Sequence, residues 1–265
     1  MQNYLLNINH SIAKKASKFL SLTTILLCSF TVCASQNIVF KSTPHPPSLL
    51  EMYSSQGCSS CPPAQALINR FLDSPNLWNK VIPIVFHVDY FNYIGWEDPF
   101  SSAKYSIRQR KLQREGLVNS VYTPGFVLNG HEWKGWFNGR ALTNDELEQS
   151  SAIKLSAVLT PERVEVEYML PDLEEPTDGI IHLAVLGFDL KTDIKTGENA
   201  NKILTDNFVV LGYRKQKIRA IRQLLKYPKL KMRANKYAVV IWTTKKNGFI
   251  PTQVIGGFLT ENWTF

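Results

Sequence analysis

The sequence predicts an α/β domain over residues 46–154, followed by a β-rich, sandwich-type domain over residues 155–265. The α/β prediction comes from a strand-like run, a C-x-x-C motif and a helical run that follow one another between residues 49 and 72. A second apolar run, residues 81–88, supplies the next buried strand. Beyond residue 154, short apolar runs separated by proline and glycine turns are typical of a β-sandwich.

The first domain is built around the cysteine motif. Residues 49–53 form a short strand-like run, and Cys58-Ser59-Ser60-Cys61 follows four residues later. Pro62 and Pro63 then introduce a helix, because proline is tolerated in a first turn whose N–H groups have no partner within the helix. The crossover from this helix to residues 81–88 implies a parallel pair of strands.

The rest of the first domain contains a hairpin and a last helix. Asn129-Gly130 lies between two apolar runs, which is a strong signal for a tight β-hairpin. Thr143 or Asn144 caps the last helix, with Glu146 close behind, and the domain ends near Lys154.

The second domain shows the periodicity of strands. The apolar runs that we expect to form them are residues 155–159, 164–169, 180–188, 202–210, 237–243 and 254–259.

A basic segment interrupts these runs, since Arg214 to Lys236 holds ten Lys and Arg and no acid. Ile218, Ile221 and Leu224 recur at helical spacing, which predicts an amphipathic helix that stops before Pro228. Such a basic face is usually just solvated, but it could also attract an anionic membrane surface or an acidic partner.

The N-terminal 34 residues have the form of a secretory signal. Lys14, Lys15 and Lys18 precede an apolar run of about fourteen residues, too short to span a bilayer, which needs about twenty. We expect cleavage after Ala34, an extended leader over residues 35–45 and a periplasmic or secreted protein. Cleavage lowers the formal net charge of +8 by three, and the remaining excess is too small to indicate a nucleic-acid partner.

Removal of the signal also simplifies the cysteine content. The chain has four cysteines, of which Cys28 and Cys33 leave with the signal, so that the mature protein keeps Cys58 and Cys61. In an oxidising compartment this pair could be joined to itself, free, exchanging with other proteins, or holding a metal with other ligands.

Several strings in the chain resemble a family of secreted bacterial proteins that bears a domain of unknown function and is classed in the thioredoxin superfamily. The strings are residues 53–63, 86–90, 95–101, 121–124, 129–130 and 197–199. The resemblance implies a thioredoxin-like domain with a disulfide-exchange site, in which Cys58 is the exposed nucleophile and Cys61 the buried resolving thiol. It also implies that Pro124 is the cis-proline facing this pair, with Thr123 before it.

The chain departs from the thioredoxin pattern in three places. The segment from Val88 to Asn119 is longer than a minimal thioredoxin needs, and Gly57 replaces the familiar tryptophan before the first cysteine. The usual buried acid of the first strand has an approximate counterpart in Glu51, one residue out of register. Glu51 and Asp89 are the acids that we expect could accept a proton from Cys61.

The residues themselves also favour redox exchange. A helix N-terminus stabilises a thiolate at Cys58, and Cys61 is close enough in sequence to resolve a mixed disulfide. A static disulfide over so few residues would stabilise the fold little. Copper or zinc could bind Cys58, Cys61 and His87, with His131 as a further ligand.

The sequence therefore predicts an exported thiol–disulfide oxidoreductase that acts on the thiols or disulfides of exported proteins without a bound cofactor. Two alternatives remain. One is a non-enzymatic binding module that uses the β-rich domain and the basic helix, and the other is copper or zinc handling at the cysteines.

Overall fold

The computed structural model describes residues 37–171 and 178–265. The predicted signal, residues 1–34, lies outside the described residues. The described residues form one compact unit. Within the part that is described, no helix has the length and apolar character needed to cross a membrane.

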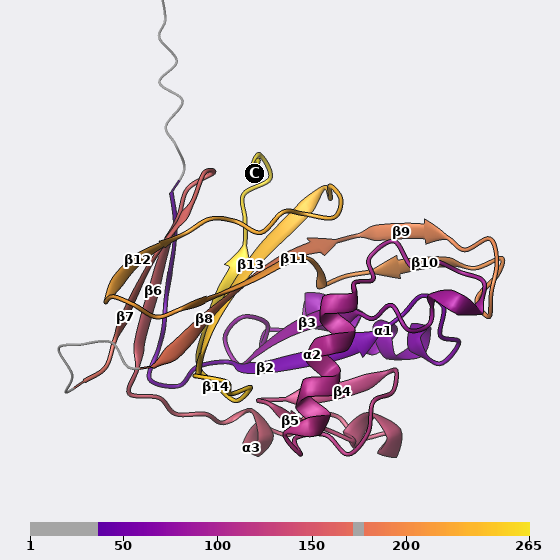
Figure 1. Ribbon diagram of the computed structural model, residues 1–265, viewed down its shortest axis with the longest axis horizontal. Coiled ribbons are helices and arrows are strands. Elements are labelled where there is room, and N and C mark those ends of the chain that lie inside the picture. Colours follow the sequence, from indigo (N-terminus) through magenta and orange to yellow (C-terminus); the bar gives the residue numbers. More distant parts are fainter. Residues whose placement is uncertain (1–36, 172–177) are drawn as a thin grey trace, which may run out of the picture. The chain divides into compact units, whose positions relative to one another are not determined.

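A mixed sheet of eight strands organises the α/β fold (Figure 1). Its strand order is β14-β13-β8-β11-β3-β2-β4-β5, in which β3 runs parallel to both β2 and β11 and the other neighbours are antiparallel. The strands are β2 (Ser48–Ser54), β3 (Val81–His87), β4 (Gly125–Leu128), β5 (His131–Glu132), β8 (Gly179–Phe188), β11 (Val209–Lys217), β13 (Lys236–Lys245) and β14 (Pro251–Phe258).

The helices lie in the first half of the described chain. They are α1 (Cys61–Asn69), α2 (Ala103–Arg114), α3 (Asn144–Leu147) and the 3-10 helices η1 (Arg70–Asp73), η2 (Asn92–Ile94) and η3 (Gly135–Asn138). The predicted helix after the cysteine motif is confirmed, with proline in the first turn of α1. The cap of α3 is confirmed as well, because Thr143 and Glu146 form a reciprocal capping box.

A second sheet, of four strands, packs against the larger one. Its order is β1-β6-β7-β12, formed by Ile38–Lys41, Lys154–Leu159, Val164–Met169 and Arg222–Leu225. Successive side chains of β8 and β13 point to opposite faces of the large sheet and so belong to two different cores. Leu183 and Val239 pack in the core shared with the four-stranded sheet. Leu186 and Val240 pack in the core that also contains residues of β2 and α1. The second half of the chain is therefore β-rich, as the sequence predicted.

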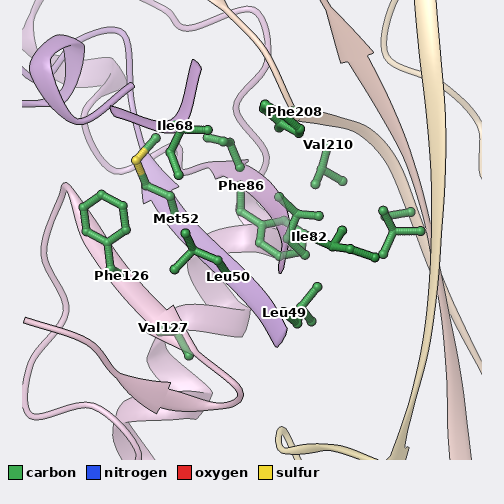
Figure 2. Close-up of a cluster of buried hydrophobic side chains, with 14 of the residues drawn as sticks. Leu49, Leu50, Met52, Ile68, Ile82, Phe86, Phe126, Val127, Phe208 and Val210 are labelled. Atoms are coloured by element: carbon green, nitrogen blue, oxygen red, sulfur yellow. The ribbon is translucent and has the colours of Figure 1, made fainter. Parts of the chain in front are cut away.

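The core under the cysteine loop combines both halves of the chain (Figure 2). Leu50 and Met52 of β2, Ile68 of α1 and Phe126 of β4 are fully buried or nearly so. Phe208 and Val210 from the second half pack in the same cluster. Each such side chain stabilises the fold by about 1.5–3 kcal/mol of free energy relative to an exposed one. The cluster therefore holds β2 in place, and the cysteine loop begins at the end of this strand.

The expected division between residues 154 and 155 does not coincide with a gap in the structure. β11 lies directly beside β3, and Val85 N–H donates to the carbonyl of Phe208 at 2.8 Å. The eight-stranded sheet thus contains strands from both expected domains. Patterns in neighbouring residues do not indicate that strands so far apart in the sequence pair with each other. The expected leader likewise contains β1, which pairs with β6.

The predicted basic helix is wrong. Residues 209–217 form β11 and residues 222–225 form β12, which pairs with β7. Arg222 bonds to Glu167 across this pair at 3.1 Å. Pairing partners in β7 and β8 outweigh the helical spacing of the apolar residues, because tertiary context overrides a weak local preference.

A hairpin extends from the large sheet toward α1. It consists of β9 (Leu190–Asp193) and β10 (Ile203–Asp206), and β10 lies beside α1 (Figure 1). The sequence predicted one strand over residues 202–210, but β10 ends at Asp206 and β11 begins at Val209. Phe208 between them has a positive φ of 61°, which breaks the strand.

Candidate functional site

The two cysteines lie between the end of β2 and the start of α1. Cys58 N–H donates to the carbonyl of Ser55, and Cys61 N–H donates to the carbonyl of Cys58, both at 3.2 Å. These bonds form successive turns that place Cys58 just before α1 and Cys61 at its first residue. Both cysteines are free thiols.

The surroundings of Cys58 favour its thiolate. Hydrogen bonds from Cys61 first, and then from Ser60, lower the pKa of Cys58 to about 6 despite its burial. The Oγ of Ser60 lies 3.2 Å from the sulfur of Cys58. On the other side, the Cys58 sulfur is 3.7 Å from the carbonyl oxygen of Thr123.

Cys61 has the opposite character. Burial raises the pKa of Cys61 well above its usual value, and the hydrogen bond and negative charge of Cys58 raise it further. Cys61 therefore stays protonated and donates its hydrogen to Cys58. The expected difference in exposure is not found, because Cys58 is 3% exposed and Cys61 is 2% exposed.

Thr123 and Pro124 lie beside the cysteines, where the resemblance placed them. The peptide bond between them is cis. Thr123 presents its carbonyl to Cys58, and β4 begins at the next residue, Gly125, and pairs with β2. The structure thus brings four of the five predicted site residues together: Cys58, Cys61, Thr123 and Pro124.

The fifth, Glu51, is engaged elsewhere. Both of its carboxylate oxygens accept hydrogen bonds from the Arg108 guanidinium, at 2.6 and 2.9 Å. The hydroxyl of Tyr53 donates to the same carboxylate at 2.8 Å. Glu51 is 1% exposed and Arg108 6% exposed, so the two side chains form a buried ion pair.

His87 and Asp89 are also engaged by other side chains. His87 Nδ1 lies 2.7 Å from the Asp98 carboxylate, and Asp89 accepts a hydrogen bond from Ser106. His131 is exposed on β5. Among residues 37–171 and 178–265, no three or more His, Cys, Asp or Glu gather as metal ligands do.

Sequence reasoning missed the hydrogen bonds that hold the cysteine loop, several of which come from the second half of the chain. Gln56 lies two positions before Cys58, and its backbone and side-chain polar groups all form hydrogen bonds. Its N–H donates to Asp98 at 2.8 Å, and its side-chain amide donates to Thr192 at 3.0 Å and to Asp206 at 2.7 Å. Its side-chain oxygen accepts from Trp96 at 3.3 Å.

Asn199 completes this support. It is fully buried and donates to the carbonyl oxygens of Gln56 at 2.8 Å and Cys58 at 3.0 Å. The strings of the resemblance contain several of these supporting residues, with Gln56 in 53–63, Asp98 in 95–101 and Asn199 in 197–199. These strings were the signal in the sequence that could have pointed to the support of the site.

A cavity of about 260 Å³ opens beside Cys61, between α1 and β10. Its lining includes Gln56, Gln65 and Asp206. Burial raises the pKa of Asp206 above its usual value. The cysteine pair is therefore bordered by the Thr123–Pro124 peptide on the Cys58 side and by a partly polar cavity on the Cys61 side.

Comparison with protein families gives one match, to a family whose function is unknown. Residues 49–243 match the model of a family described as "Protein of unknown function (DUF1223)". No curated protein matches the chain.

Two solved structures are similar in fold. One is the crystal structure of protein AGR_C_4864 from Agrobacterium tumefaciens, with 25% identity and a TM-score of 0.56, covering 82% of this chain and 96% of that one. The other is HBP35 of Porphyromonas gingivalis, with 12% identity and a TM-score of 0.56, covering 82% of this chain and 76% of that one.

Proposed function

We propose that this chain, which belongs to the DUF1223 family of proteins of unknown function, is an exported thiol–disulfide oxidoreductase. One observation carries the proposal. Two neighbouring thiols at the start of α1 have pKa values shifted in opposite directions, and the Thr123–Pro124 peptide borders the lower one. Strongly perturbed thiols beside one another are typical of exchange sites rather than of structural cysteines.

The arrangement of elements supports a thioredoxin-like unit within the sheet. β2, α1 and β3 form a parallel strand–helix–strand unit, with the cysteines between β2 and α1. β4 and β5 then add antiparallel strands on the other side of β2, and a cis proline directly precedes β4. This is the order of elements that the resemblance implied.

The low pKa of Cys58 makes it the attacking group. With a pKa of about 6, roughly 90% of Cys58 is thiolate at pH 7, against roughly 3% for an ordinary thiol. The thiolate of Cys58 attacks one sulfur of a partner disulfide, forms a mixed disulfide and releases the other partner sulfur as a thiolate.

Cys61 completes the exchange. After Cys58 has reacted, Cys61 loses its proton and attacks the Cys58 sulfur, which releases the second partner thiol. The partner disulfide has then gained two electrons, and Cys58 and Cys61 are joined as a disulfide. Run backwards, the same steps oxidise a partner dithiol, and the direction depends on the reduction potentials of the two pairs.

Export is the second part of the proposal. A signal over residues 1–34 would deliver the protein to an oxidising compartment, where its partners are the thiols and disulfides of exported proteins. A thiolate-stabilised pair suits such a compartment, because stabilisation of the reduced form makes the oxidised pair a stronger oxidant.

A trapping experiment tests the proposal. With Cys61→Ala, Cys58 can form a mixed disulfide with an exported protein, but this disulfide is not resolved within the site. We expect complexes that resist non-reducing electrophoresis, disappear on reduction and contain exported proteins. Cys58→Ala is the matched control and should trap none, because the raised pKa of Cys61 keeps this thiol protonated at neutral pH.

If neither variant traps a partner and Cys58 titrates as an ordinary thiol, the oxidoreductase proposal is wrong. A non-enzymatic binding module that merely retains the cysteines would then be favoured.

A further inference from the structure

The turn between β9 and β10, residues 194–202, holds one specific peptide group of the cysteine loop. Asn199 Nδ2 donates to the carbonyl oxygen of Cys58 at 3.0 Å. Glu198 Oε2 accepts from the backbone N–H of Ser59 at 2.9 Å. These two backbone atoms belong to the same peptide group, the one that joins Cys58 to Ser59. Two consecutive residues of a distant turn therefore hold both polar ends of one peptide plane.

The orientation of this plane determines where Ser60 lies relative to Cys58. A peptide group moves as a rigid plane, so its rotation changes ψ of Cys58 and φ of Ser59 together. The residue that follows, Ser60, places its hydroxyl 3.2 Å from the Cys58 sulfur, and its backbone N–H also helps to lower the pKa of Cys58. Rotation of the held plane would move these donors away from the sulfur that they stabilise.

The turn is itself anchored and can act as a fixed support. Asn199 is fully buried, and its side-chain oxygen accepts from Lys202 Nζ at 2.9 Å. Gly197 has φ +79°, and a Cβ there would lie 3.2 Å from the Cβ of Trp96. Thr196 donates to the carbonyl of Gly95. The turn is thus fastened to the loop after β3 before it reaches the cysteines.

We propose that Asn199 and Glu198 are positioning residues of the cysteine site, which hold the peptide group between Cys58 and Ser59 and thereby set the reactivity of Cys58. The inference rests on the proposed function, because it assigns these residues to that same site. The two side chains act differently. Asn199 is neutral and contributes geometry, whereas Glu198 adds a negative charge near a thiolate and so also restrains it.

The pH profile of Cys58 alkylation tests this. The reduced full-length mature chain is treated with iodoacetamide from pH 4.5 to pH 9, and modification of Cys58 is followed by mass spectrometry. For Asn199→Ala we expect alkylation at pH 6 about fivefold slower than in the wild type, because Ser60 is no longer held against the sulfur.

Two substitutions at Glu198 separate its hydrogen bond from its charge. Glu198→Gln keeps an acceptor for Ser59 N–H and removes the charge, so alkylation at pH 5.5 should be up to about twofold faster, the small size reflecting solvent screening. Glu198→Ala removes both, and its alkylation should be about threefold slower than that of Glu198→Gln. Glu97→Gln, an exposed acid on the neighbouring loop, is the matched control and should leave the profile unchanged.

The outcomes are distinguishable from those of the proposed function, because alkylation requires no protein partner. The inference is overturned if the Asn199→Ala profile superimposes on that of the wild type in a variant with the wild-type urea unfolding curve. If Asn199→Ala does not fold, coincident profiles for Glu198→Ala and Glu198→Gln overturn it instead. Absence of trapped partners in Cys61→Ala, by contrast, counts against the oxidoreductase and not against the positioning role.

Discussion

Replacement of Arg108 by methionine should destabilise the fold strongly, because it leaves the carboxylate of Glu51 buried without its partner. Arg108 donates twice to this carboxylate, and its guanidinium lies 5.5 Å from the ring centre of Phe86 and 5.1 Å from that of Phe249. Methionine keeps most of the apolar stem but supplies no charge and no donor.

The expected cost follows from the burial of both partners. Removal of one member of a buried pair costs about 3–5 kcal/mol. A typical domain has a total stability of about 5–15 kcal/mol, so Arg108→Met should lose a large part of it.

Urea unfolding of the mature chain at pH 7 measures this cost. The double variant Glu51→Gln/Arg108→Met removes the stranded charge but keeps an acceptor for Tyr53, so it should recover more than half of the loss. In the double variant the alkylation profile of Cys58 should match that of the wild type, because Glu51 contacts Arg108 and Tyr53.

Two results would refute this reasoning. One is a cost below about 1 kcal/mol for Arg108→Met, since the pair would then behave as a surface pair. The other is that mixed disulfides at Cys58 are resolved more slowly in the double variant than in the wild type. Glu51 would then act as the proton acceptor for Cys61, as the sequence predicted.

Two further predictions concern another ion pair and the N-terminus. Burial opposes the charge on His87 and on Asp98, but their mutual attraction outweighs it and raises the pKa of His87 while lowering that of Asp98, with Asp206 and Lys231 also acting on His87. The stability that the charge on His87 contributes is fully present below about pH 6.5 and is lost as the pH rises through the raised pKa of His87. The stability that the charge on Asp98 contributes is fully present above about pH 3.9. Asp98→Asn should accordingly cost more stability in urea unfolding at pH 5.5 than at pH 9, and equal costs would contradict the assignment. Mass measurement of the exported protein should place its N-terminus near Ser35, and an intact Met1 would disprove signal cleavage.

The local features of the site could be predicted from the sequence. The start of α1 at Cys61 follows from two prolines directly after the motif. The hairpin at Asn129-Gly130 is confirmed by positive φ values of 49° and 85° at these residues. In each case the physical cause acts over a few positions, so neighbouring residues are sufficient to indicate it.

The role of Glu51 could not be predicted in the same way. Its place on the first strand suggested a proton acceptor, but its partner Arg108 lies 57 positions away on α2. The residues around an acid on an apolar strand are the same whether its carboxylate faces a thiol or a guanidinium. The choice between the two depends on where α2 packs.

The sequence alone was sufficient to predict the candidate site residues and the start of the helix that follows them, α1. The tertiary structure decided what holds them, because β11 pairs with β3 and the hairpin between β9 and β10 reaches the cysteine loop. It also decided that residues 209–217 and 222–225 are strands. The reason is the same throughout: Asn199 and Cys58 are 141 positions apart, and contacts over such separations leave no periodic pattern in the residues around them.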